Sequence, residues 1–260
     1  MTERFEGRGV VVTGGAQGMG LAITSAFLAE GASVLIADLN DGRAEEAAAG
    51  LDAEHPGRVL AQRCDVRSGQ DFQATIDRAV AEFGSVDVLA NNAGAITMNK
   101  VVDLTDDEWD LNMDVNAKGV FNGTRAVLPH MLERGSGAIV NTASEAGKMG
   151  MPLVAHYCAA KAAVIGFTRA VAREVAPHVR VNAVCPGTVE TEMLDRLSAI
   201  ETELTGASRE EIDEFLLSEI PMGRFQKPSD IANVVLFLCS DAASEMTGQA
   251  LNVTGGKVQT

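Results

Sequence analysis

The sequence has few groups that bind metals or nucleic acids. Its 260 residues include four histidines and four cysteines, and neither type shows the spacing of a metal site. The cysteines are scattered and lie within or beside apolar segments, so we expect buried free thiols and no bound metal. The 21 basic residues are outnumbered by 36 acidic ones, which gives a net charge of −15. This charge disfavours nucleic acid and membrane surfaces as partners.

Long apolar runs and targeting signals are also missing. No stretch approaches the roughly 20 apolar residues that cross a bilayer. Glu3 and Glu6 lie where a secretory signal would carry basic residues. Apolar residues make up 46% of the chain and charged residues 22%, a composition typical of globular proteins. We therefore expect a cytoplasmic globular protein.

Short β-branched apolar segments alternate with longer alanine-rich segments along the whole chain, which is typical of βαβ units in a parallel sheet. The expected strands are 9–13, 33–37, 59–64, 86–90, 138–142, 179–184 and 250–253. The expected helices are 19–30, 41–53, 69–83, 106–133, 154–176 and 228–239. The sequence therefore predicts one α/β domain over residues 1–260, a doubly wound parallel sheet of the Rossmann type with about seven strands.

One connection is much longer than the others. Residues 188–227 separate Pro186-Gly187 from Pro228, whereas a βα loop usually needs about 2–6 residues. Acidic and apolar side chains are interleaved there, which predicts two short amphipathic helices. We expect this segment to be a helical lid over a substrate site; the alternative is a solvated surface excursion.

The first expected strand leads into a glycine-rich turn directly before a helix. Gly14, Gly18 and Gly20 would let backbone amides approach a pyrophosphate closely. Asp38 ends the second strand, where a carboxylate binds the adenosine ribose and repels a 2′-phosphate. Arg43, the one basic residue nearby, is interpreted as helix surface. The sequence therefore predicts NAD as cofactor rather than NADP.

Polar or turn residues also follow the ends of the later strands. Ligands of open parallel sheets bind outside the carboxyl ends of the strands, so we expect these residues to gather along one edge. They are Asp65 and Val66 after the third strand, Asn92, Ala93 and Gly94 after the fourth, Ser144 after the fifth, and Pro186 and Gly187 after the sixth.

Tyr157 is the only tyrosine of the chain, and Lys161 follows it by one helical turn. The two side chains should therefore share a helix face. A cation beside a phenol favours the phenolate and lowers a pKa of roughly 10 toward neutrality. Such a pair is common on helices, but together with the polar sheet edge it makes Tyr157 a candidate general acid and base.

Together these motifs resemble the short-chain dehydrogenase/reductase family, over nearly all of the chain. The resemblance rests on Thr13–Gly20, Asn91–Gly94, Asn116, Ser144, Tyr157 with Lys161, and Pro186-Gly187. It implies that Tyr157 exchanges a proton with a secondary alcohol while a hydride passes to or from NAD. By the same resemblance Ser144 binds the substrate oxygen, Lys161 holds the nicotinamide ribose, and Asn116 positions a water that relays the proton.

The resemblance also implies a set of cofactor-binding residues. Among them Asp65 and Val66 would hold the adenine, and Val189 and Thr191 would meet the nicotinamide carboxamide. The full set is Gly14, Gln17, Gly18, Met19, Gly20, Asp38, Leu39, Asp65, Val66, Asn92, Ala93, Gly94, Val115, Tyr157, Lys161, Pro186, Gly187, Val189 and Thr191.

The pattern is closest to small polyol, acetoin and butanediol dehydrogenases of that family. This similarity rests on the long lid, Ala143–Gly147 and the ending from Gly248 to Gly256. Glu145 takes the place of a glutamine found in many such relatives; a carboxylate there would bind substrate hydroxyls and repel acidic substrates. The expected substrate-binding residues are Ser144, Glu145, Met149, Met151, His156, Tyr157, Met193 and Leu197.

Other functions stay open at this point. Residues 164–193 also resemble 3-oxoacyl-thioester reductases, although Asp38 and the acidic lid argue against NADPH and an acidic carrier. A lid rich in methionine and leucine would also suit a hydroxysteroid dehydrogenase. Sugar-nucleotide epimerases share the tyrosine–lysine pair but need a larger C-terminal domain. An NAD-binding sensor or scaffold would have no need of the acid–base residues.

The expected partners are a small alcohol or ketone and further copies of the chain. Helix 154–176 is apolar on nearly every side, and with residues 249–258 it resembles the interfaces of family tetramers. We therefore expect a homotetramer or a homodimer. Thr254 departs from this pattern, because relatives often have aspartate before the double glycine.

Overall fold

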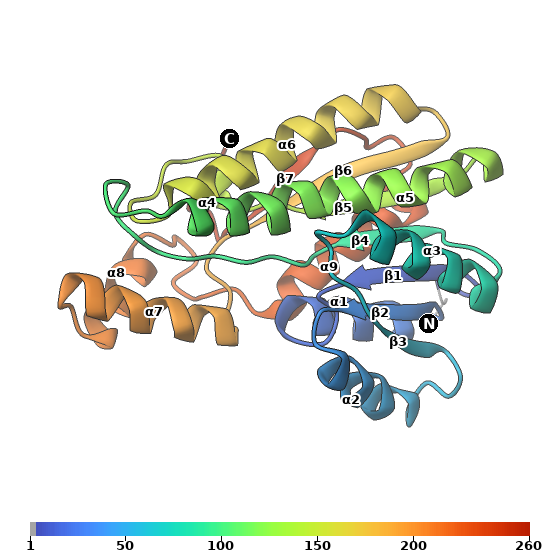
Figure 1. Cartoon of the computed structure of the whole chain (residues 1–260), viewed down its shortest axis with the longest axis horizontal. Coiled ribbons are helices and arrows are strands. Elements are labelled where there is room, and N and C mark those ends of the chain that lie inside the picture. Colours follow the sequence, from blue (N-terminus) through green and yellow to red (C-terminus); the bar gives the residue numbers. More distant parts are fainter. Residues whose placement is uncertain (1–3) are drawn as a thin grey trace.

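The computed structural model describes residues 4–260. Its centre is a parallel sheet with the strand order β3-β2-β1-β4-β5-β6-β7 (Figure 1). The order reverses between β1 and β4, as in a doubly wound sheet, and this confirms the predicted fold class. The strands are β1 (Gly9–Thr13), β2 (Ser33–Asp38), β3 (Val59–Arg63), β4 (Val88–Asn91), β5 (Gly137–Thr142), β6 (Val179–Pro186) and β7 (Ala250–Val253).

Helices cover both faces of the sheet and create two apolar cores. Val10 and Val12 of β1 point into one core and Val11 into the other, all three fully buried. Strands covered on both faces have continuous rather than alternating apolar sequences, which explains their appearance in the chain. The first core is closed by α1 (Gly18–Ala29), α2 (Asp41–Asp52) and α9 (Pro228–Cys239), and the second by α3 (Gly69–Phe83), α5 (Gly119–Arg134) and α6 (Ala155–Val175).

The single helix expected at 106–133 is interrupted. It consists of α4 (Asp106–Asn112), a π-helical turn (Met113–Lys118) and α5. A π-turn accommodates one extra residue without breaking the helix, so the sequence still appears as one continuous helical stretch. Asn116 lies in this wide turn, where its amide Nδ2 donates to the carbonyl of Asn112 (2.9 Å).

Strand β4 begins at Val88 rather than at residue 86. Asp87 still bonds to both neighbouring strands through its backbone: its amide donates to the Gly9 carbonyl (2.8 Å) and its carbonyl accepts from the Ala138 amide (3.0 Å). The Val86 amide instead donates to Nε2 of His130 (3.2 Å), which takes the place of a ladder bond at that residue.

The long connection after β6 folds into two helices, as its spacing predicts. They are α7 (Glu192–Thr205) and α8 (Arg209–Ser218), which lie together at one end of the molecule (Figure 1). Gly206 ends α7 in the left-handed region (φ 79°), and Ser208 caps α8 together with Glu211. Between residues 4 and 260, none of the helices combines the length and apolar character that crossing a membrane requires.

Candidate active site

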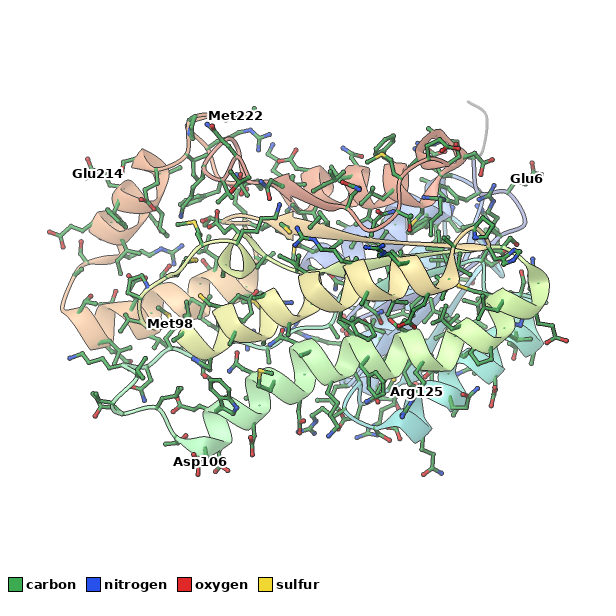
Figure 2. The ribbon with its side chains drawn as sticks, turned by 90° about the horizontal axis from the view of Figure 1, so that it is seen from above. Glu6, Met98, Asp106, Arg125, Glu214 and Met222 are labelled. Carbon is green, nitrogen blue, oxygen red and sulfur yellow. The ribbon has the colours of Figure 1, made fainter. Side chains whose placement is uncertain are left out.

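Two adjoining hollows lie at the carboxyl edge of the sheet. A cavity of about 480 Å³ holds Ser144 and Tyr157 in its wall, and a second hollow contains Asp38 and Asp65. The two share Gly14, Gln17, Ala93, Gly94, Ile96, Met193, Arg196 and Leu197. Met98, which lines the first cavity, and Glu214 of α8 lie at the same end of the molecule in Figure 2. One continuous cleft therefore runs from the end of β2 to the lid.

The ends of β1 and β4 are joined by side-chain hydrogen bonds. Thr13 Oγ1 accepts from the amides of Asn92 (2.9 Å) and Ala93 (3.0 Å). The side-chain Nδ2 of Asn92 in turn donates to the backbone carbonyls of Thr13 (3.1 Å) and Gly14 (3.3 Å). This hydrogen-bond network fixes the glycine turn at the point where the strand order reverses.

The turn itself has no room for side chains. Gly14 and Gly18 have positive φ (61° and 52°), and a Cβ at Gly20 would collide with the carbonyl oxygen of Gly14. Gly18, Met19 and Gly20 open α1 and line the cleft. Free backbone amides at a helix N-terminus bind phosphate groups, so this cradle fits a dinucleotide pyrophosphate.

Asp38 is held in place at the end of β2. Its Oδ2 accepts from the Ala16 amide (3.2 Å) and its Oδ1 from the Asn40 amide (3.0 Å). Arg43 lies on the exposed surface of α2, as the sequence predicts, and pairs with Glu192 at the start of α7 (3.1 Å). Its guanidinium is therefore engaged with a carboxylate of the lid.

The expected adenine residues line the same hollow. Val66 is buried against Gly119 of α5, and Val115 and Leu39 complete the wall. The Asp65 carboxylate is bound by the Arg67 guanidinium (2.6 Å), and this hydrogen bond lowers the pKa of Asp65. The hollow thus combines an apolar surface with two fixed carboxylates.

Ser144, Tyr157 and Lys161 come together on the cavity wall. Ser144 follows β5 and caps a short 3-10 turn, its Oγ accepting from the Ala146 amide (3.1 Å). Tyr157 and Lys161 lie on successive turns of α6, with Lys161 Nζ 5.5 Å from the centre of the tyrosine ring. The buried Lys161 ammonium donates to the carbonyl of Thr142 (2.7 Å).

The direction of the Tyr157 pKa shift differs from the sequence expectation. Burial raises the pKa of Tyr157 to about 12, although its hydrogen bond with Ser144 acts to lower it. Burial also lowers the pKa of Lys161 to about 8. The cost of removing the phenolate from water outweighs the neighbouring hydrogen bond, so at neutral pH Tyr157 keeps its proton.

Asn116 lies directly behind this group. Its Nδ2 donates to the carbonyl of Ala95 (2.7 Å), and its Oδ1 accepts from the Ala95 amide (3.3 Å). A Cβ placed on Gly94 would lie 3.0 Å from Asn116 Oδ1 and 3.7 Å from Lys161 Nζ. The asparagine and the lysine therefore meet at Gly94, on the cofactor side of the cleft.

His156 is the one predicted substrate residue that lies elsewhere. It is fully buried, and its Nε2 is hydrogen-bonded to Thr97 Oγ1 at 2.7 Å. Adjacent residues of a helix point about 100° apart, so His156 cannot share the face of Tyr157. The other predicted substrate residues line the cavity, namely Ser144, Glu145, Met149, Met151, Tyr157, Met193 and Leu197, as do the predicted cofactor residues Pro186, Gly187, Val189 and Thr191.

The sequence interpretation missed five charged residues of the cavity: Glu192, Arg196, Glu201, Glu219 and Lys257. Lys257 Nζ lies 3.3 Å from Glu145 Oε1 and 3.1 Å from Glu219 Oε2. Lys257 follows Gly255-Gly256, far along the chain from Glu145, and no spacing rule connects the two. The only sequence signal for Lys257 is that it directly follows a double glycine near the end of β7.

A glycine cradle at the switch point, with a tyrosine–lysine pair at the same sheet edge, defines an α/β oxidoreductase fold that binds a nicotinamide dinucleotide. Residues 14–257 match the family model described as enoyl-(acyl carrier protein) reductase. The chain belongs to the short-chain dehydrogenase/reductase family.

Three similar proteins illustrate the range of this family. The chain is 40% identical to a 3-oxoacyl-[acyl-carrier-protein] reductase of Thermotoga maritima, over 98% of this chain and 99% of that protein. It is 43% identical to 2-(S)-hydroxypropyl-CoM dehydrogenase 3 of Xanthobacter autotrophicus, over 98% of each chain. A crystal structure of a short-chain glucose/ribitol dehydrogenase from Brucella melitensis superposes with a TM-score of 0.86 at 34% identity, covering 100% of both chains.

The substitution Gly20→Ala tests the cradle. We expect it to abolish measurable NADH binding in a fluorescence titration, because the added methyl group collides with the Gly14 carbonyl. Gly50→Ala in α2 is the matched control: nothing lies within 4 Å of its added Cβ. The control should bind NADH normally and gain about 0.5–1 kcal/mol in unfolding free energy. Unchanged NADH binding by Gly20→Ala would contradict the assignment.

Proposed function

We propose that this protein interconverts a secondary alcohol and a ketone with NAD(H), and that its substrate is a small polyol, diol or hydroxyketone. The observation that carries the proposal is the placement of Tyr157 and Ser144 on the wall of a cavity that continues into the glycine cradle. An acid–base group and a dinucleotide site thus open into one cleft.

The cofactor assignment rests on the residues that would hold it. Bound NAD(H) supplies or accepts the hydride, which no side chain can do. The amides of Gly18 to Gly20 would bind its pyrophosphate, and Asp38 would accept hydrogen bonds from the adenosine ribose. Asp38 disfavours a 2′-phosphate, and three arginines near it are paired with carboxylates: Arg43 with Glu192, Arg63 with Asp71 and Arg67 with Asp65. These features support NAD over NADP.

Several side chains of the cleft take part in proton transfer, each in a different role. In the reductive direction the Tyr157 hydroxyl donates its proton to the carbonyl oxygen, and Ser144 Oγ donates a hydrogen bond to the same atom. The nearby Lys161 ammonium offsets the phenolate charge that results. Because Asn116 and Lys161 meet at Gly94, a water held there would return a proton to Tyr157 from solvent.

The cavity supports a small polar substrate. Its volume of about 480 Å³ suits a compact molecule, and its wall carries charged side chains among apolar residues: Glu145, Glu192, Glu201 and Glu219, together with Lys161, Arg196 and Lys257. The carboxylates outnumber the cations by one, which disfavours an acidic substrate. The proposal is also supported by the name of the similar Brucella melitensis protein, a glucose/ribitol dehydrogenase, which refers to polyhydroxy compounds.

A 3-oxoacyl-thioester reductase is the second candidate, favoured by the similarity to the Thermotoga maritima reductase. Two features of this chain weigh against it. The lid carries many acidic side chains, which would repel an acidic carrier protein. Asp38 is also unsuited to the NADPH that carrier-protein reductases prefer. A hydroxysteroid dehydrogenase would need an apolar cavity, whereas this one has buried charges.

Exposed aromatic residues support self-association into a homotetramer or a homodimer. Phe121 of α5 is 40% exposed and packs edge-on against Phe167 of α6 (6.2 Å), and Trp109 of α4 is 44% exposed. Large apolar side chains at the surface mark interfaces. We propose that copies of the chain meet on α4, α5 and α6, and that the enzyme is cytoplasmic.

Replacement of Tyr157 by phenylalanine tests the reaction assignment. We expect kcat/KM to fall by roughly 100-fold to 10,000-fold, because the proton donor is lost while the ring remains. NADH absorbance measures turnover, and NADH fluorescence should show unchanged cofactor binding. Wild-type turnover by Tyr157→Phe would refute the mechanism, and cofactor binding without turnover in the wild type would favour an NAD-binding sensor.

The raised pKa of Tyr157 predicts opposite pH responses for the two directions. Alcohol oxidation needs the phenolate, whose fraction rises about tenfold per pH unit below the pKa, so oxidation should accelerate steadily from pH 7 to 10. Ketone reduction needs the phenol and should not slow through loss of that proton in this range. Ser144→Ala removes the bond that lowers this pKa and should shift the oxidation profile to higher pH. A flat oxidation profile between about pH 6 and 10 would count against the phenolate.

Asp38→Ala should reduce the preference for NAD. We expect the Kd for NADH to rise roughly tenfold and the Kd for NADPH to fall, because ribose acceptors and phosphate repulsion are lost together. Glu45→Ala, which removes an exposed carboxylate of α2 outside the cleft, is the matched control. Equal NADH and NADPH affinities in the wild-type protein would contradict the NAD assignment.

A further inference from the structure

Glu145 and Lys257 form a buried ion pair in the cavity wall that proton transfer does not use. The Glu145 and Lys257 side chains are only 4% and 5% exposed, and their charged atoms lie 3.3 Å apart. Burial of two charges is costly unless their remaining hydrogen-bonding positions are also satisfied. A role for the pair therefore has to account for those positions.

Each partner has hydrogen-bonding capacity left over. Glu145 Oε2 is buried and has no hydrogen-bond partner within residues 4–260. The Lys257 ammonium has three protons. Among residues 4–260 it is paired with two acceptors, Glu145 Oε1 and Glu219 Oε2. The pair thus offers one acceptor and one donor, side by side, to a further group.

The position of the pair points to the substrate as that group. Glu145 directly follows Ser144, the residue placed at the reacting oxygen, and both line the same cavity with Lys257. Lys257 is carried there by a turn after β7, in which Thr254 Oγ1 accepts from the Val258 amide (3.1 Å). This hydrogen bond gives a local role to Thr254, the residue that departs from the family pattern.

We propose that Lys257 and Glu145 form a specificity site for a second hydroxyl group of the substrate, on a carbon close to the one that reacts. The hydroxyl donates its proton to Glu145 Oε2 and accepts from Lys257 Nζ. This inference rests on the proposed function, and it adds a residue of the C-terminal segment to substrate recognition.

The chemistry of the pair selects among neighbouring substrate classes. A simple ketone leaves both groups unpaired in a buried site, which is penalised. A 3-oxoacyl thioester offers a second carbonyl, which accepts from Lys257 but has no proton for Glu145. A carboxylate would be repelled by Glu145 and Glu219. A vicinal diol or hydroxyketone satisfies both groups.

Acetoin and butan-2-one are matched probes, because they differ by one hydroxyl on the same four-carbon chain. With NADH as the reductant, we expect wild-type kcat/KM to be at least about tenfold higher for acetoin. Equal values would overturn the inference and would mean that Glu145 Oε2 is satisfied inside the protein, for example by Gln226, which lies against the same face of Gly187.

The variants Lys257→Met and Glu145→Gln/Lys257→Met test the residues themselves. The double variant leaves no unpaired charge buried, so it should fold even if the single variant does not. In each folded variant we expect the acetoin to butan-2-one ratio to fall about tenfold, because acetoin turnover falls more than butan-2-one turnover. Lys118→Met, which removes an exposed lysine on the π-turn, should leave the ratio unchanged.

The outcomes separate this inference from the proposed function. An unchanged ratio in the double variant, or an equal loss on both substrates, would overturn the specificity site while leaving an active alcohol dehydrogenase. Absence of turnover with every secondary alcohol and ketone in the wild type would overturn both the proposed function and the specificity site.

Discussion

The hydrogen bonds between Thr13 and Asn92 are the constraint on which the rest of the site depends. They join the ends of β1 and β4, the two strands between which the sheet reverses its order. Without them the glycine turn would be free to move away from Gly94, and Gly94 is the point where Asn116 and Lys161 meet. This small hydrogen-bond network thus positions the proposed cofactor cradle and sets its distance from the proposed proton-transfer residues.

The electrostatic environment of the cleft differs between the end proposed to bind adenosine and the end proposed to transfer protons. At the end proposed to bind adenosine, the Asp38 carboxylate accepts a hydrogen bond from the Ala16 amide, and the Asp65 carboxylate is bound by Arg67, which lowers the pKa of Asp65. At the lid end Tyr157 and Lys161 are largely removed from water, which raises the pKa of Tyr157 and lowers that of Lys161. Burial makes each of these groups easier to neutralise, which is the condition for moving protons rather than for binding ions.

Much of the fold and of the chemistry could be read from the sequence because both are local. Apolar strands and alanine-rich helices alternate visibly, and Tyr157 and Lys161 are related by one helical turn. The features that were placed wrongly or not found from the sequence depend on the three-dimensional geometry of the chain. The π-turn at Asn116 does not interrupt the helical stretch, His156 is directed away from the cavity by the helix angle, and Lys257 meets Glu145 only because β7 lies beside β6. The pKa of Tyr157 was misjudged because its burial depends on the whole lid and cavity wall.

The cavity wall also divides by position along the chain. Residues that hold the dinucleotide phosphates and transfer protons, from Gly14 to Lys161, all precede β6, whereas Met193, Glu219 and Lys257 of the cavity follow it. The lid and the C-terminal part of the substrate cavity are therefore encoded after the stretch that carries Ser144, Glu145, Tyr157 and Lys161. Recombination at a crossover within β6 would exchange that part of the cavity and leave the earlier residues in place, a route by which one scaffold can acquire new substrates.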